Sequence, residues 1–96
     1  MIEVPARPFF ELALTQLCAE CLKEYVKKEP EYGDTWLSYT VDDLKRAVKI
    51  EATKLTATED LDLLVHRIID LAAYTTFLFA QTNRDLALSK QKTGAN

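Results

Sequence analysis

Glycine and alternating apolar and polar runs are both scarce in this sequence. Only Gly33 and Gly94 are glycines among the 96 residues, and no useful stretch alternates apolar with polar side chains. Such alternation is typical of a half-buried strand, so strands are not expected. Apolar residues instead recur every three or four positions, which is the spacing of one face of a helix. We therefore predict an all-α fold, an antiparallel bundle of three main helices.

Excess positive charge is also missing. The formal net charge is −3 and the pI is near 5.1, and the basic residues are scattered along the chain. A general nucleic-acid binder needs a basic stripe that neutralises phosphates. We therefore expect no nucleic-acid partner.

No leader with a charged start, an apolar middle and a small-residue cleavage site is found at the beginning of the chain. The most apolar segment, residues 59–81, carries ionisable residues within its apolar run. They are Asp62, His66, Arg67 and Asp70. Because a simple membrane span would lack these charges, we expect a cytoplasmic protein with no membrane partner.

Cysteine is limited to Cys18 and Cys21, which form a CxxC spacing. A metal site would need a second pair of ligands, and His66, the single histidine, is far along the chain. A thioredoxin-like site would need a preceding strand, whereas these cysteines fall in the middle of an expected helix. We interpret both as small core residues of a protein from a reducing compartment.

Residues 59–81 are the segment around which we expect the chain to be organised. On a helical wheel at about 100° per residue, one face forms a core stripe. It consists of Leu61, Leu64, Val65, Ile68, Ala72, Thr75 and Phe79. A second, mixed face consists of Leu63, His66, Asp70, Tyr74, Phe77 and Gln81. Two other helices would scarcely cover both faces, so we predict a homodimer or a dimer of dimers, with Phe77, Leu78 or Leu71 at the contact.

A first helix is expected from Pro8 to about Lys28, because proline is tolerated in a first turn and Pro30 would stop the helix. It should be amphipathic. Its apolar stripe consists of Phe10, Leu14, Leu17, Cys21 and Tyr25.

The second helix is expected to start at Thr40 as N-cap, with Asp43 completing a capping box, and to run to about Leu55. Thr58 is expected to cap the third helix. We assign residues 1–89 to one helical domain and residues 90–96 to a flexible C-terminal tail.

The loop over residues 29–39 carries aromatic side chains, and Gly33 is expected to adopt a positive φ there. The aromatics of such a loop usually fold back as a roof over the core. Alternatively, the loop stacks on a planar ligand such as a base, with Tyr32, Asp34 and Trp36 as the candidate residues.

Glu51 falls in the middle of the apolar face of the second helix, where an unpaired carboxylate would be very costly. Asp70, on the third helix, is a candidate to meet it. In one interpretation both acids belong to a structural ion-pair network with Lys54, Arg67 or His66. In the other they share a Mg²⁺ ion, and His66 orients Asp70.

The run KKEPEYGDTW, followed by IEATKL and then IIDLAAYTTFL, resembles the nucleotide-modification-associated helical domain of bacteria and phages. The resemblance covers about residues 22–81. More distantly, the arrangement resembles MazG-type all-α nucleoside triphosphate pyrophosphohydrolases, which hold Mg²⁺ with an EExxE on one helix and an ExxD on the next. Glu51 and Asp70 match that pattern. Other ligand positions do not, since Arg67 stands three residues before Asp70, and Ala47, Val48 and Lys54 replace further acids.

These observations predict a small self-associating protein of nucleotide-pyrophosphohydrolase-like ancestry. A non-catalytic interaction or regulatory module, or a nucleotide-binding one, fits the missing acids, and we assign no catalytic residue. The alternative is a Mg²⁺-dependent nucleoside triphosphate pyrophosphohydrolase that uses Glu51 and Asp70.

Overall fold

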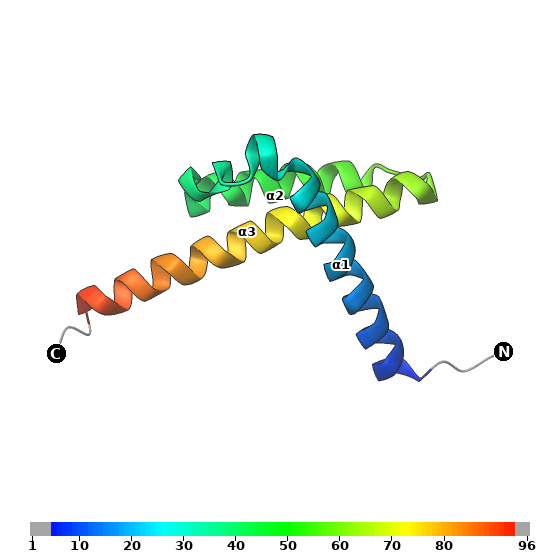
Figure 1. The fold of residues 1–96 in the computed structure, drawn as a ribbon, viewed down its shortest axis with the longest axis horizontal. Helices are drawn as coiled ribbons and strands as arrows, with labels where there is room; N and C mark the ends of the chain where they lie inside the picture. Colours follow the sequence, from blue (N-terminus) through cyan, green and yellow to red (C-terminus); the bar gives the residue numbers. More distant parts are fainter. Residues whose placement is uncertain (1–4, 94–96) are drawn as a thin grey trace.

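The computed structural model describes residues 5–93 and confirms an all-α fold, with no strand in that range. Three α-helices and one 3-10 turn follow one another along the chain (Figure 1). They are α1 (Ala6–Tyr32), η1 (Thr35–Ser38), α2 (Val41–Thr56) and α3 (Leu61–Thr93).

Helix α1 is longer than expected at its C-terminal end. It continues through Pro30 to Tyr32, so the predicted stop near Lys28 is wrong. Proline fixes φ close to the helical value, and in the last turn it removes only one intrahelical donor. The next amide keeps the helical pattern, since the Gly33 N–H donates to the Glu29 carbonyl oxygen over 2.9 Å.

Gly33 does not adopt the predicted positive φ. Its φ of −50° and ψ of −44° are helical, because it extends the last turn of α1. A Cβ atom built on Gly33 would lie 2.7 Å from Cγ and from the carbonyl oxygen of Glu29. Glycine is therefore favoured at this position by the close approach of the preceding turn and not by backbone handedness.

Helix α2 begins as predicted. The Asp43 amide donates to the Thr40 hydroxyl and the Thr40 amide donates to the Asp43 carboxylate, each over 3.0 Å, which confirms the capping box.

Helix α3 is capped by Asp60, and the predicted cap at Thr58 is wrong. The Asp60 carboxylate accepts the Leu63 amide over 2.9 Å, while the Thr58 hydroxyl donates back to the Lys54 carbonyl oxygen over 2.7 Å. The helix then continues to Thr93, well past the expected end near Gln81, because no proline or glycine interrupts it. Residues 90–93 of the predicted tail are therefore helical, and residues 94–96 lie outside the described residues.

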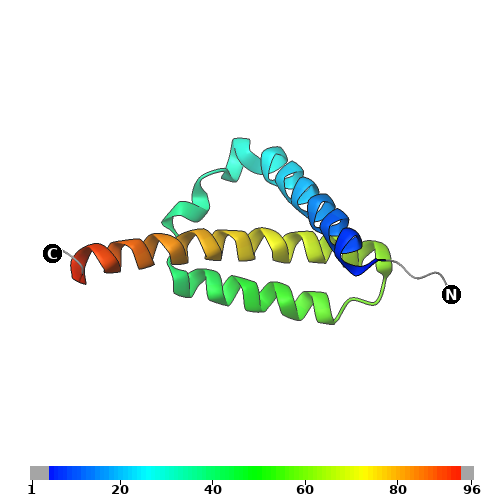
Figure 2. The same ribbon diagram turned by 90° about the horizontal axis from the view of Figure 1, so that it is seen from below.

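Helices α2 and α3 run side by side and form a helical hairpin, whereas α1 crosses α3 and extends away from it (Figures 1 and 2). The buried apolar residues are few: Leu44 on α2 is fully buried and Ile69 on α3 nearly so. The Cα radius of gyration is 16.7 Å, against about 12–13 Å for a compact chain of this length. The single chain is therefore much more extended than a closed bundle.

The stripe that was predicted to be the core of α3 is mostly exposed. Leu61, Val65, Ile68 and Phe79 are each at least 40% exposed, and Thr75 is exposed as well. The buried apolar residue of α3 is Ile69, which lies on the flank of that stripe. The wheel thus located apolar faces but not the buried residue.

Helix α1 has no buried residue among those described. On its predicted stripe Leu17, Cys21 and Tyr25 are half-buried, while Phe10 and Leu14 are exposed. Cys18 is exposed as well, so its interpretation as a core residue is wrong for the single chain. Partial burial, together with the neighbouring thiol of Cys18, raises the pKa of the Cys21 thiol above its usual value.

Candidate binding pocket and apolar groove

Two cavities flank the point at which α1 crosses α3. The larger, which we call the apolar groove, has a volume of about 900 Å³ and lies between α1 and α3. It is lined by Leu14, Leu17, Cys18, Cys21, Leu22, Tyr25, Trp36, Ile68, Leu71, Ala72, Ala73, Thr75, Thr76, Phe77, Phe79 and Ala80. None of these side chains carries a full charge.

The smaller cavity, which we call the aromatic pocket, has a volume of about 380 Å³ and lies between the C-terminal end of α1, η1 and α3. Aromatic rings dominate its lining: Tyr25, Tyr32, Trp36, Tyr39, Tyr74 and Phe77. Three charged side chains, Glu24, Lys28 and Asp70, also line it. A planar ligand with polar edges suits this combination of ring faces and charges.

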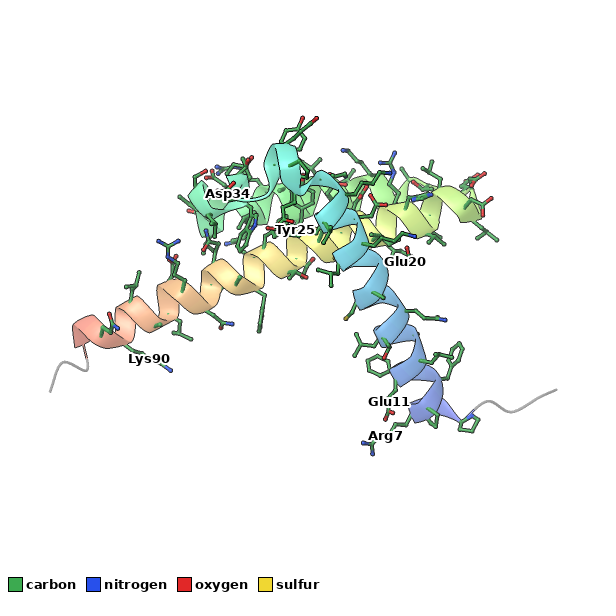
Figure 3. The ribbon with its side chains drawn as sticks, viewed as in Figure 1. Arg7, Glu11, Glu20, Tyr25, Asp34 and Lys90 are labelled. Carbon is green, nitrogen blue, oxygen red and sulfur yellow. The ribbon has the colours of Figure 1, made fainter. Side chains whose placement is uncertain are left out.

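A cluster of rings separates the groove from the pocket. Trp36 stacks on Phe77 with ring centroids 4.8 Å apart and an interplanar angle of 12°. Tyr25 and Tyr74 meet the same Phe77 ring edge-on, with centroids 6.2 and 5.9 Å away. Figure 3 shows Tyr25 at the crossing of α1 and α3. These contacts fix Trp36 from one side and link α1, η1 and α3.

Polar contacts hold η1 against the helices. The Tyr25 hydroxyl donates to the Gly33 carbonyl oxygen over 2.5 Å and accepts from the Trp36 indole over 3.5 Å. From α3, the buried Gln81 side-chain amide lies within hydrogen-bonding distance of three carbonyl oxygens. They belong to Trp36, Leu37 and Tyr39, at 3.3, 3.0 and 3.1 Å.

No role was predicted for Gln81 from the sequence. The sequence did contain a signal for a buried hydrogen bond. Gln81 lies one turn beyond Phe77 on the mixed face of an apolar helix, where a side-chain amide needs a buried partner. The partner could not be predicted, since it is the backbone of a turn more than 40 residues away.

The structure brings together some of the predicted site residues. Tyr32, Trp36 and Asp70 all line the aromatic pocket, whereas Asp34 does not and is exposed on η1's N-terminal side (Figure 3). Asp70 is half-buried and makes no hydrogen bond or ion pair with the residues that the structure describes. Its carboxylate is therefore free to accept from a bound molecule.

Glu51 lies elsewhere. It is 9% exposed on the hairpin face of α2, and its carboxylate pairs with the Lys54 ammonium one turn later, at 3.3 Å. Glu51 lines neither the groove nor the pocket. The polar partner of this buried acid is thus supplied by its own helix.

The other predicted ion-pair residues do not contact Asp70 through any hydrogen bond or ion pair in residues 5–93. His66 is exposed, and Arg67 is half-buried with its Nε atom buried and unbonded. No group of three or more His, Cys, Asp or Glu residues in the described range could hold a metal ion. Because Glu51 and Asp70 do not share either cavity, the residues present do not fit the predicted Mg²⁺ site.

Comparison with known proteins identifies no relative of this chain. No protein-family model, curated protein or solved structure matches the chain. The resemblance carried by YGDTW and DLAAY therefore stays a prediction.

Helix α3 has one further property. The part from Leu61 to Gln91 is long and apolar enough to cross a membrane, by length and composition alone, and little of it is buried within the chain. The core helix of a soluble protein can pass the same test. The expectation of no membrane partner stays a prediction.

Proposed function

We propose that this protein is a non-catalytic helical module that self-associates and acts as an interaction or regulatory unit. The observation that supports this proposal is the uncovered apolar surface of α1 and α3. Phe9 and Phe10 on α1 are 61% and 63% exposed, and Phe79 on α3 is 68% exposed. Exposed apolar surface in this amount marks a contact with another molecule.

The amount of surface supports a large contact. The chain exposes 7964 Å², whereas a compact protein of 10.9 kDa exposes about 5,600 Å². The excess is roughly 2,400 Å² per chain. Two chains that covered this excess would bury about 4,800 Å² together, which lies in the range of obligate dimers.

Sedimentation equilibrium and light scattering test this proposal. At micromolar concentration we expect a mass at least twice the chain mass of 10.9 kDa. A monomer that keeps full helicity at that concentration would contradict self-association.

A nucleotide-binding function is the second candidate, and the aromatic pocket favours it. Tyr32, Trp36 and the unpaired Asp70 line one cavity of suitable size. Base stacking on an aromatic ring contributes about 1–3 kcal/mol per base, and Asp70 can accept from an exocyclic amine. The Mg²⁺-dependent pyrophosphohydrolase alternative has less support, because Glu51 lies outside the pocket and pairs with Lys54.

A thermal-shift screen of nucleosides and nucleotides, with and without Mg²⁺, tests this second candidate. A ligand that binds only the folded protein at 100 times its Kd stabilises it by about 2.7 kcal/mol. Asp70→Asn should abolish the shift, whereas Asp34→Asn is the matched control and should keep it. The absence of any thermal shift at millimolar nucleotide would contradict the nucleotide-binding proposal.

A further inference from the structure

The N-terminal half of α1, residues 6–17, is covered only at its end, where Leu14 and Leu17 line the apolar groove. Every residue from Ala6 to Gln16 is exposed. Figures 1 and 3 show this half projecting away from α2 and α3, with Arg7 and Glu11 near its end. An isolated helix of this length is marginal in water, so an ordered one needs a surface to pack against.

The face that lines the apolar groove continues into this largely exposed half. Leu14, Leu17 and Cys21 line the groove. At about 100° per residue, Phe10 falls within about 40° of all three on the helix. One apolar stripe therefore contributes its C-terminal part to a groove and leaves its N-terminal part uncovered.

The absence of unpaired charge on both surfaces favours their meeting. Arg7 and Glu11 are the only charged residues between positions 6 and 17, and they pair with each other at 2.8 Å. The groove lining carries no charged side chain. Docking this half-helix into the groove would therefore bury no unpaired charge, which is the main cost of covering such a surface.

We infer that the N-terminal half of α1 from a second copy occupies the apolar groove, and that the two copies exchange these halves reciprocally. This inference rests on the proposed self-association and adds its geometry. The same patch serves both copies, as in an isologous two-fold interface. Each α1 then lies antiparallel to its counterpart, with Phe10 of one copy close to Cys21 of the other.

A disulfide cross-link tests the geometry. The variant Phe10→Cys, combined with Cys18→Ala, leaves thiols only at positions 10 and 21. On one helix these positions are about 16 Å apart, too far for a disulfide, which needs Cα atoms within about 7 Å. We expect mild oxidation to give a covalent dimer on non-reducing gels, with peptide mapping that joins position 10 to position 21.

Leu86→Cys with Cys18→Ala is the matched control, because Leu86 is exposed on α3 but does not line the groove. It should give no such dimer. A second pair of variants measures affinity: Phe10→Glu should raise the dimer Kd by at least about 30-fold, whereas Ile50→Glu, on the exposed side of α2, should change it less than about 3-fold.

The possible failures are distinguishable. A wild-type dimer that gives no link between positions 10 and 21 would overturn the exchange and leave self-association intact. A wild-type monomer would overturn both. A monomer that co-sediments with phosphatidylcholine vesicles, and loses this property in Phe10→Glu, would assign the apolar surface to lipid.

Discussion

The helical hairpin and α1 differ in whether they bury their apolar residues. The hairpin of α2 and α3 contains Leu44 and Ile69, the two buried apolar residues of the described chain, and its first helix has a complete capping box. Helix α1 buries none of its residues, although it is almost as rich in large apolar side chains.

The difference between these regions shows that helix formation and helix covering have separate causes. Both regions are helical because their residues favour helices and nothing interrupts them. Only in the hairpin are the two packed helices, α2 and α3, joined by a connection of four residues. The start of α1, residues 6–13, lines no cavity against α3, so its stability as a helix depends on contacts beyond the crossing.

The largest expected effect falls where the two regions meet. Trp36→Ala removes the stack on Phe77 and should lower the free energy of unfolding by about 3 kcal/mol, the low end for a large aromatic because Trp36 is half-buried. Urea unfolding followed by circular dichroism measures this. Leu86→Ala, exposed on α3 and outside both cavities, is the control and should leave the free energy of unfolding nearly unchanged. A retained stability with a lost nucleotide response would instead assign Trp36 to ligand stacking.

Gln81→Leu, on α3, should have a smaller effect. It removes the amide that donates to the carbonyl oxygens of Trp36, Leu37 and Tyr39, and should lower the free energy of unfolding by about 2 kcal/mol. Amide exchange of η1, measured by NMR, should accelerate. Gln91→Leu, exposed near the end of α3, is the matched control. Unchanged exchange at η1 would show that ring packing alone holds the turn.

Glu51→Gln tests the buried acid of the hairpin. The free energy of unfolding of the variant should fall by about 1–2 kcal/mol. This is less than the loss expected on breaking a fully buried ion pair, because Lys54 is 48% exposed and its ammonium can return to water. Chemical unfolding with and without Mg²⁺ should give the same loss. The exposed Glu59→Gln is the control. A variant that was more stable, and had lost a Mg²⁺ response shown by the native protein, would restore the metal interpretation.

The smallest expected effect concerns pH and the start of α2. The Thr40 amide, and then the Thr40 hydroxyl, hold the pKa of the Asp43 carboxyl below its usual value of 3.8. A lowered folded-state pKa means that Asp43 stabilises the hairpin above pH 3.8, and that this contribution is lost as the pH falls through the lower value.

Thermal melts of the native protein and Asp43→Asn should therefore differ at neutral pH and converge in acid. Asp42→Asn, in the same first turn but without a bond to Thr40, should show a smaller difference. A difference between the native protein and Asp43→Asn that persisted at pH 2 would show that the hydrogen bonds to Thr40 do not depend on the charge.

Local chemistry was the part of the fold that the sequence predicted well. The capping box of Thr40 and Asp43 needs only residues three positions apart, and it is present. Thr58 was expected to cap α3 with Asp60 in its first turn, but Asp60 is the cap, because the start of the helix depends on where the connection turns in the packed hairpin.

Faces and partners were less predictable. The wheel identified apolar stripes on α3, but which residues of α3 are buried depends on how the helices cross, and the buried apolar one is Ile69. For the site, the candidates Tyr32, Trp36 and Asp70 line one pocket, whereas the candidate Asp34 does not. Glu51 was expected beside Asp70, because each lies on an inward face of its helix. The two faces point to different places, however, since Asp70 lines the aromatic pocket and Glu51 does not.

The short connection between α2 and α3 also bears on the order in which the chain folds. Closing a loop of four residues, 57–60, costs little chain entropy, so contacts across the hairpin can form early. The bonds from Gln81 to η1 join residues 42 to 45 positions apart and must form later. A rapid phase that reports the hairpin, followed by a slower change in Trp36 fluorescence, is the kinetic signature expected of this chain.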